Sequence, residues 1–182
     1  EGLAGVSASQ VEIQSGIQFY DGISTAEIQE ILIKSASDLI DLDHPNYQYV
    51  AARLLLFSVK KSLYGRMHDT PVLKDHVVKC VEKGIYDEEI LNLYDDEEFD
   101  KLQDIIDHQR DYLFTYAGLR QIVDKYLVQD RSSGSLYETP QFMYLLISAT
   151  IFSKYPKEVR LDYVKKYYDA ISRHKINIPT PI

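Results

Sequence analysis

The sequence predicts a mainly α-helical protein with a small β-hairpin, and three observations lead to this fold class. Apolar residues recur at a helical period along 47–64. A capping box begins at Ser24, and a Thr-Pro pair at Thr139 marks the start of another helix. The composition, 45 % hydrophobic and 26 % charged over 182 residues, is typical of a globular chain that buries a substantial core.

The first predicted helix spans 24–42. Ser24 is its expected N-cap, and Glu27 lies three residues later, where its carboxylate can bond back to the cap. Its apolar stripe consists of Ile28, Ile31, Leu32, Leu39 and Ile40. The helix should end before Pro45, because the residue that precedes a proline is disfavoured in the helical region.

The second predicted helix spans 47–64 and should stop at Gly65. Its recurring apolar positions are Val50, Leu54, Phe57 and Leu63. The polar segment 65–71 that follows is the predicted boundary between two parts of the chain.

The rest of the chain continues the helical pattern. Further helices are expected at 72–83, 87–93, 95–107, 115–123, 139–152 and 157–172. Thr139 should cap its helix, with Pro140 in the first helical position. The small hairpin is expected between 126–128 and 136–137, because Gly134 and its polar neighbours form a turn signal.

Charge and cysteine content exclude several classes of protein. The net charge of −8 argues against a nucleic-acid duplex as main partner, since phosphates are neutralised by clustered Lys and Arg. A single cysteine, Cys80, rules out an internal disulfide and a cysteine-rich zinc site. No apolar run approaches the ~20 residues that span a membrane, and no signal peptide is visible, so a cytoplasmic setting is expected.

Both ends of the chain predict a piece of a longer protein. The chain begins at Glu1 without an initiator Met and ends at Ile182 in an apolar, Pro-rich run. A processed mature chain is the alternative explanation.

No complete catalytic or metal site can be assembled from the residues alone. The histidines form no HxxxH or HExxH pair, and no Gly-rich phosphate loop occurs. One polar group on adjacent turns consists of Asp107, His108, Arg110 and Asp111. It fits an acid–base site, although a structural polar network is the favoured interpretation. Cys80 is expected to be a buried, inert thiol.

A small anion site is the best-supported binding feature. Thr25 lies at a helix N-terminus, where free amides and the helix dipole attract phosphate. Lys60 and Lys61 lie at the end of the next helix, and a helical hairpin would bring these two ends together. The alternative is an ordinary helix cap beside solvent-facing lysines.

Six strings of residues, in the same order along the chain, resemble the large (alpha) subunit of class I ribonucleotide reductase. They are IQFYDG at 17–22, NYQYVAARLL at 46–55, DHVV at 75–78, KYLV at 125–128, LYETPQF at 136–142 and IPTPI at 178–182. The resemblance implies that 1–65 is the later part of an ATP cone. It also implies that 66–182 is the helical domain that precedes the ten-stranded catalytic barrel.

The family reduces ribonucleoside diphosphates to deoxyribonucleotides by radical chemistry. The resemblance implies a radical-generating small (beta) subunit as partner, a homodimer of the large subunit, and no membrane or nucleic-acid partner. The catalytic cysteines would lie outside this chain, which would therefore be inactive alone.

The resemblance also implies roles for individual residues. Thr25 and Lys61 match cone positions that contact the allosteric effectors ATP or dATP, and Thr180 matches a position that holds the substrate diphosphate. No catalytic residue, metal or cofactor is implied within this chain. The opening Lys-Arg-Asp-Gly turn of the cone is absent, and some members carry His at the positions of Gln29 and Ser58. The partial cone is expected to bind nucleotide weakly or not at all.

A second hypothesis is a stand-alone helical interaction module without nucleotide chemistry. The full reading frame distinguishes the two, because the reductase hypothesis requires an upstream Lys-Arg-Asp-Gly turn and a Cys soon after the final PTPI string.

Overall fold

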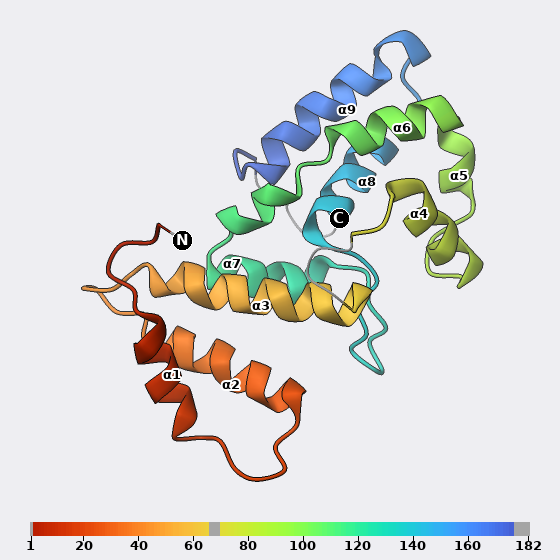
Figure 1. Cartoon of the computed structure of the whole chain (residues 1–182). Helices are drawn as coiled ribbons and strands as arrows, with labels where there is room; N and C mark the ends of the chain where they lie inside the picture. The colour runs from red at the N-terminus through yellow and green to blue at the C-terminus, as the bar shows by residue number, and fades with distance from the viewer. Residues whose placement is uncertain (1, 66–69, 177–182) are drawn as a thin grey trace.

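A computed structural model describes residues 2–65 and 70–176, and these ranges are predominantly helical without a strand or sheet (Figure 1). The α-helices are α1 (Ala8–Gly16), α2 (Thr25–Asp38), α3 (Tyr47–Tyr64), α4 (Leu73–Glu82), α5 (Glu89–Leu93), α6 (Asp96–Ile105), α7 (Tyr116–Gln121), α8 (Pro140–Phe152) and α9 (Lys157–Ser172). A 3₁₀-helix, η1 (His108–Leu113), precedes α7, and a π-helical turn, η2 (Ile122–Tyr126), follows it. No helix within the described ranges is both long enough and apolar enough to cross a membrane.

The prediction of a mainly helical fold is confirmed. Helix caps explain the helix boundaries that were predicted most closely. Ser24 and Glu27 form the predicted capping box of α2. Thr139 is the N-cap residue of α8 with Pro140 first in the helix, although the Thr139 hydroxyl makes no capping hydrogen bond. Two elements, α1 and η1, were not predicted.

The predicted hairpin at 126–137 is wrong as a pair of strands. The two segments share one isolated antiparallel bridge, between Gln129 and Leu136. The Val128 amide, which a longer ladder would use, donates instead to the Glu138 carboxylate at 2.9 Å. A side-chain carboxylate thus accepts the hydrogen bond that a backbone carbonyl would accept in a longer ladder, and the strand pairing does not extend further.

The helix α3 lies between two groups of helices (Figure 1). On one side it packs against α2, which also contacts α1. On the other side it packs against α7 and η1. Beyond them α8 and α9 pack together, with α6 against α9 and α4 against α6. The chain therefore has a small unit, α1–α3, joined through α3 to a larger one.

Two hydrophobic cores follow from this arrangement. The small core consists of Val11, Ala36, Tyr47 and Ala51. The large core runs from Ile33 on α2 through to α9, and its fully buried members include Leu73, Leu119, Phe142, Leu145 and Tyr168. Because α3 also places Leu55, Leu56 and Val59 in the large core, this one helix supplies side chains to both.

Candidate functional site

The first turn of α2 leaves two backbone donors unused. Its capping box engages the Ser24 amide, which donates to Glu27 at 2.9 Å, and the Glu27 amide, which donates to the Ser24 hydroxyl at 3.2 Å. The amides of Thr25 and Ala26 have no intrahelical acceptor, as expected for the first helical residues. Thr25 is exposed, so these donors and its hydroxyl face solvent.

Lys61 lies in the last turn of α3, and its side chain is exposed. Gly65 ends the helix in the left-handed conformation, with φ of 76°, which glycine adopts without strain. Because α2 and α3 pack antiparallel, the start of α2 and the end of α3 point to the same side of the pair (Figure 1). A helix N-terminus beside an ammonium group is suited to bind an anion.

Lys60 does not join this site, so the expected pair of lysines is reduced to one. Successive residues on a helix point about 100° apart, and Lys60 faces η1. Its residue is 5 % exposed, and its ammonium lies 3.5 Å from a carboxylate oxygen of Asp111. The sequence held a signal for this, since Lys60 follows the buried Leu56 by four residues and therefore shares its face.

The polar group around η1 is a buried network. Asp111 is 1 % exposed and accepts a hydrogen bond from the Gln141 side chain at 2.9 Å. Burial raises the pKa of Asp111 from its ordinary 3.8 to about 6, against the opposing effect of the Lys60 charge. Burial likewise lowers the pKa of His108 to about 4. Asp111 is closed to a substrate and His108 is half-buried beside it, which supports the structural interpretation.

The other predicted positions lie apart from these donors. Gln29 is buried within α2, and Ser58 is half-buried one turn before Lys61. The Glu27 carboxylate lies at the start of α2 and is exposed, so an anion bound there would have this negative charge beside it. Thr180 lies outside the described residues.

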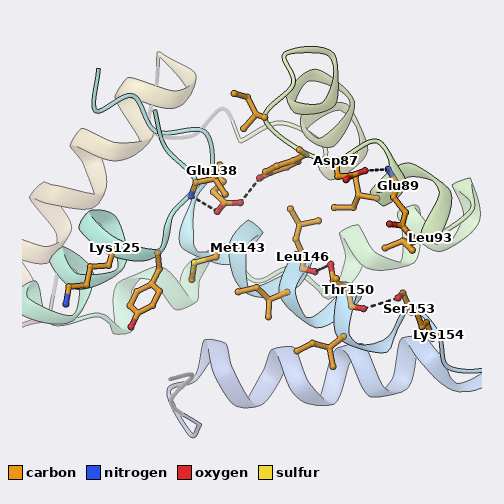
Figure 2. Close-up of a pocket in the computed structure, with 17 residues that line it drawn as sticks. Asp87, Glu89, Leu93, Lys125, Glu138, Met143, Leu146, Thr150, Ser153 and Lys154 are labelled. Atoms are coloured by element: carbon orange, nitrogen blue, oxygen red, sulfur yellow. Dashed lines mark hydrogen bonds between the residues drawn. The ribbon is translucent and has the colours of Figure 1, made fainter. Parts of the chain in front are cut away.

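A separate open groove runs between the α4–α5 segment and α8 (Figure 2). Its walls are largely apolar, with residues such as Leu93, Met143 and Leu146. Glu138 is the buried polar group at one end, where Tyr86 donates to its carboxylate at 2.5 Å and the Lys125 ammonium points away from it (Figure 2). Burial raises the pKa of the Tyr86 hydroxyl, so this pair is not poised for nucleophilic attack.

The other titratable groups among the described residues form no reaction centre. Cys80 is buried, and burial raises the pKa of its thiol, which keeps it in the weakly nucleophilic protonated form. Within residues 2–65 and 70–176, no cluster of His, Cys, Asp or Glu is arranged to hold a metal ion.

Two known domain families match separate parts of the chain. The ATP cone domain family matches residues 4–62, and the family of the ribonucleotide reductase all-alpha domain matches 112–182. Ribonucleoside-diphosphate reductase 1 subunit alpha of Escherichia coli K12 is 54 % identical over all 182 residues. The chain belongs to the ribonucleotide reductase large-subunit family.

Other reductase subunits match over nearly the same length. The alpha subunit from Haemophilus influenzae is 56 % identical over the whole chain, and that of bacteriophage T4 is 42 % identical over 98 % of it. The chain spans about a quarter of these relatives, 24 % in each of the three cases. These matches do not favour the stand-alone interaction module.

Proposed function

We propose that this chain is the effector-binding and helical part of a ribonucleoside-diphosphate reductase large subunit. The whole protein would reduce ribonucleoside diphosphates by radical chemistry, as a homodimer that receives its radical from a small (beta) subunit. Support comes from relatives named ribonucleoside-diphosphate reductase that match the chain end to end. The buried, protonated Cys80 is unsuited to reductive chemistry, so the catalytic cysteines would lie elsewhere in the protein.

The effector site would lie where α2 begins and α3 ends, with the domain boundary between residues 65 and 66. One observation carries this proposal: the free first-turn amides at Thr25 and the exposed ammonium of Lys61 lie toward the same end of the antiparallel pair. Backbone amides and the helix dipole would bind the phosphates of ATP or dATP, and Lys61 would neutralise their charge.

Neutralisation by Lys61 matters because the Glu27 carboxylate already occupies the same helix end. A phosphate would enter against that negative charge, so the lysine should contribute a large share of the affinity. Gln29 and Ser58 are both neutral, and neither adds positive charge. Lys61 is therefore the side chain whose removal tests the site best.

The test is calorimetry of dATP binding to the full-length protein. We expect Lys61→Ala to weaken binding by on the order of 1.5–3 kcal/mol, the contribution of a hydrogen bond to a charged group. Lys101→Ala is the matched control, because Lys101 is also exposed on a helix but pairs with Glu97 on α6. Equal affinities for wild type and Lys61→Ala would contradict the assignment.

Thr180 would hold the diphosphate of the substrate, as the resemblance implies. Thr180→Val keeps the side-chain shape and removes the hydroxyl, so it should mainly raise the Michaelis constant, by roughly tenfold for ~1.4 kcal/mol lost. Steady-state kinetics of the full-length enzyme with its small subunit measure this, and wild-type kinetics would withdraw the role.

A further inference from the structure

The groove between the α4–α5 segment and α8 contains a buried carboxylate without a cationic partner (Figure 2). Three carboxylates are buried among the described residues, those of Glu98, Asp111 and Glu138. Glu98 pairs with the Arg160 guanidinium, and Asp111 lies 3.5 Å from the Lys60 ammonium. Glu138 differs from both, because no ion pair within residues 2–65 and 70–176 includes it.

Neutral donors alone hold the Glu138 carboxylate. The Tyr86 hydroxyl donates to one oxygen at 2.5 Å, and the Val128 amide donates to the other at 2.9 Å. Glu138 is 2 % exposed, and burial raises the pKa of its carboxyl. A carboxylate accepts roughly four hydrogen bonds when all its lone pairs are used, so much of this capacity is open. A buried charge is stable when it is paired, and a cation that enters the groove would pair with it.

The walls that lead away from Glu138 suit the aliphatic part of a ligand. Met143 and Leu146 line the groove from α8, and Ile90 and Leu93 line it from α5. The volume of the groove is about 1200 Å³, the size of a large ligand pocket. Apolar walls with a few convergent polar groups are typical of small-molecule sites.

Hydroxyl and carboxylate oxygens further along the groove are acceptors. The Thr150 hydroxyl donates to the Leu146 carbonyl at 2.8 Å, and the Ser153 hydroxyl donates to the Thr150 carbonyl at 2.9 Å. Each hydroxyl proton is therefore used, while the oxygen keeps free lone pairs. Asp87 on the facing wall is exposed and forms no ion pair with another described residue. A ligand that bonds to these groups must carry donors.

Two lysines also line the groove, but neither neutralises the buried carboxylate. Both are exposed, and the Lys125 ammonium points away from Glu138 (Figure 2). Lys154 lies beyond the end of α8, on the wall opposite Asp87 (Figure 2). The net charge of −8 makes the whole chain attractive to cations. Positive charge on a ligand therefore fits at Glu138 and toward Asp87.

We propose that this groove binds a linear aliphatic polyamine, with one ammonium on the Glu138 carboxylate and a second toward Asp87. A primary ammonium group supplies three donors, which match the acceptors of the groove. The methylene segments between the ammonium groups lie along Met143 and Leu146. The site uses no residue of the proposed effector site, so it adds a second binding function to the chain.

The test is calorimetry on the full-length large subunit without nucleotides, with spermidine and the monoamine hexylamine as probes. Spermidine should bind at one site per chain and more tightly than hexylamine, which can pair with Glu138 alone. Glu138→Gln keeps the shape of the side chain and removes its charge, so both probes should bind roughly ten- to a hundredfold more weakly. Asp87→Asn should weaken spermidine binding and leave hexylamine binding unchanged.

Matched controls separate the site from folding and from general charge. Glu98→Gln also removes a buried carboxylate, but outside the groove, so both probes should bind as they do to the wild type. Ile151→Arg places a cation in the groove at a position that is 50 % exposed, so the protein should fold and bind both probes more weakly. Leu42→Arg adds the same charge at a fully exposed position and should have no effect. A thermal melt of each variant shows that it is folded.

Each outcome supports or overturns the site. Weaker spermidine binding in Glu138→Gln and Ile151→Arg, with wild-type binding in both controls, supports it. If Glu138→Gln does not fold, the comparison of Ile151→Arg with Leu42→Arg decides. Unchanged binding in the groove variants would reflect the general attraction of an acidic chain for cations and overturns the site. Hexylamine that binds as tightly as spermidine overturns the polyamine assignment. A subunit that binds neither probe also overturns it, because the groove is then closed to the ligand.

Discussion

The unit α1–α3 and the larger unit α4–α9 stabilise themselves in different ways. The first has a small core of its own and leaves large apolar side chains exposed, with Ile13 at 67 %, Ile17 at 80 % and Leu42 at 100 %. The second encloses α8, whose residues are buried on nearly every face. The small unit is therefore held in place largely because α3 inserts side chains into the core of its neighbour.

The same motif in both units illustrates the contrast. A capping box begins α2 with Ser24 and Glu27, and another begins α6 with Asp95 and Glu98. Glu27 is exposed, whereas Glu98 is 2 % exposed and pairs with the guanidinium of Arg160 on α9. The box of α2 caps a helix end and binds only the exposed Tyr20 hydroxyl beside it, whereas the box of α6 also joins two helices in the core.

The largest expected effect comes from a cavity in the large core. Leu145 is completely buried in α8, so Leu145→Ala should lower the free energy of unfolding by about 2–5 kcal/mol. Leu42→Ala makes the same chemical change at a fully exposed site and should stay within about 0.5 kcal/mol of the wild type. Urea denaturation measures both, and similar losses in the two variants would remove the contrast between the units.

A matched pair of charge-neutralising variants compares the capping boxes. Glutamine retains the capping geometry, so Glu27→Gln should leave stability nearly unchanged. Glu98→Gln leaves the Arg160 charge without its partner and should cost about 1.5–3 kcal/mol. Arg160 lowers the pKa of Glu98. The difference in stability between the wild type and Glu98→Gln should therefore disappear as the pH falls below the usual pKa of a glutamate side chain. Equal denaturation midpoints for the two variants at pH 7 would refute this difference.

Asp111 predicts the opposite pH dependence at the junction of the two units. Its pKa is raised from 3.8 to about 6, so the folded state binds the proton more tightly than the unfolded state. This contribution is present at low pH and is lost as the pH rises from about 4 to about 6, on the order of 3 kcal/mol in all. Asp111→Asn should remove it. Across this range, the free energy of unfolding measured by denaturation should depend less on pH in the variant than in the wild type. An equal pH dependence in both proteins would count against the ionisation of a buried Asp111.

The smallest effect should be local to the small unit. The Tyr47 hydroxyl accepts the Ser7 amide at 3.0 Å and donates to Gln10, which ties the start of α1 to α3. Tyr47→Phe removes both contacts and should cost about 1 kcal/mol. Hydrogen exchange should accelerate in α1 and remain unchanged in α8. A uniform acceleration would mean that the two units open together.

The sequence was most informative about the fold where caps and apolar periodicity agreed. The bounds of α3 and α8 follow from Gly65 and Pro140, residues that fix local backbone geometry. The helix α1 was missed because its pattern is weak, with Val11 its only buried apolar residue and Ile13 facing solvent. The hairpin failed because side-chain acceptors such as Glu138 compete for backbone amides, which strand patterns do not reveal.

The candidate site was predictable in its elements but not in its side chains. Thr25 and Lys61 are exposed at the helix ends where the sequence placed them. Lys60 was assigned to the same site, although its spacing of four residues from the buried Leu56 places it on the inner face of α3. What local spacing could not reveal is its partner, because Asp111 lies 51 positions away along the chain.

The sharing of α3 has a consequence for dissecting the protein. A cut in the linker after Gly65 would divide the chain at the predicted boundary but would leave the buried face of α3 seated against α7. The two fragments would then be held by apolar contact and by the buried ion pair of Lys60 with Asp111, as in fragment complementation. Two peptides produced separately should therefore associate in solution. The unit α1–α3 could be exchanged as a separate part only together with the surface of α7 that contacts it.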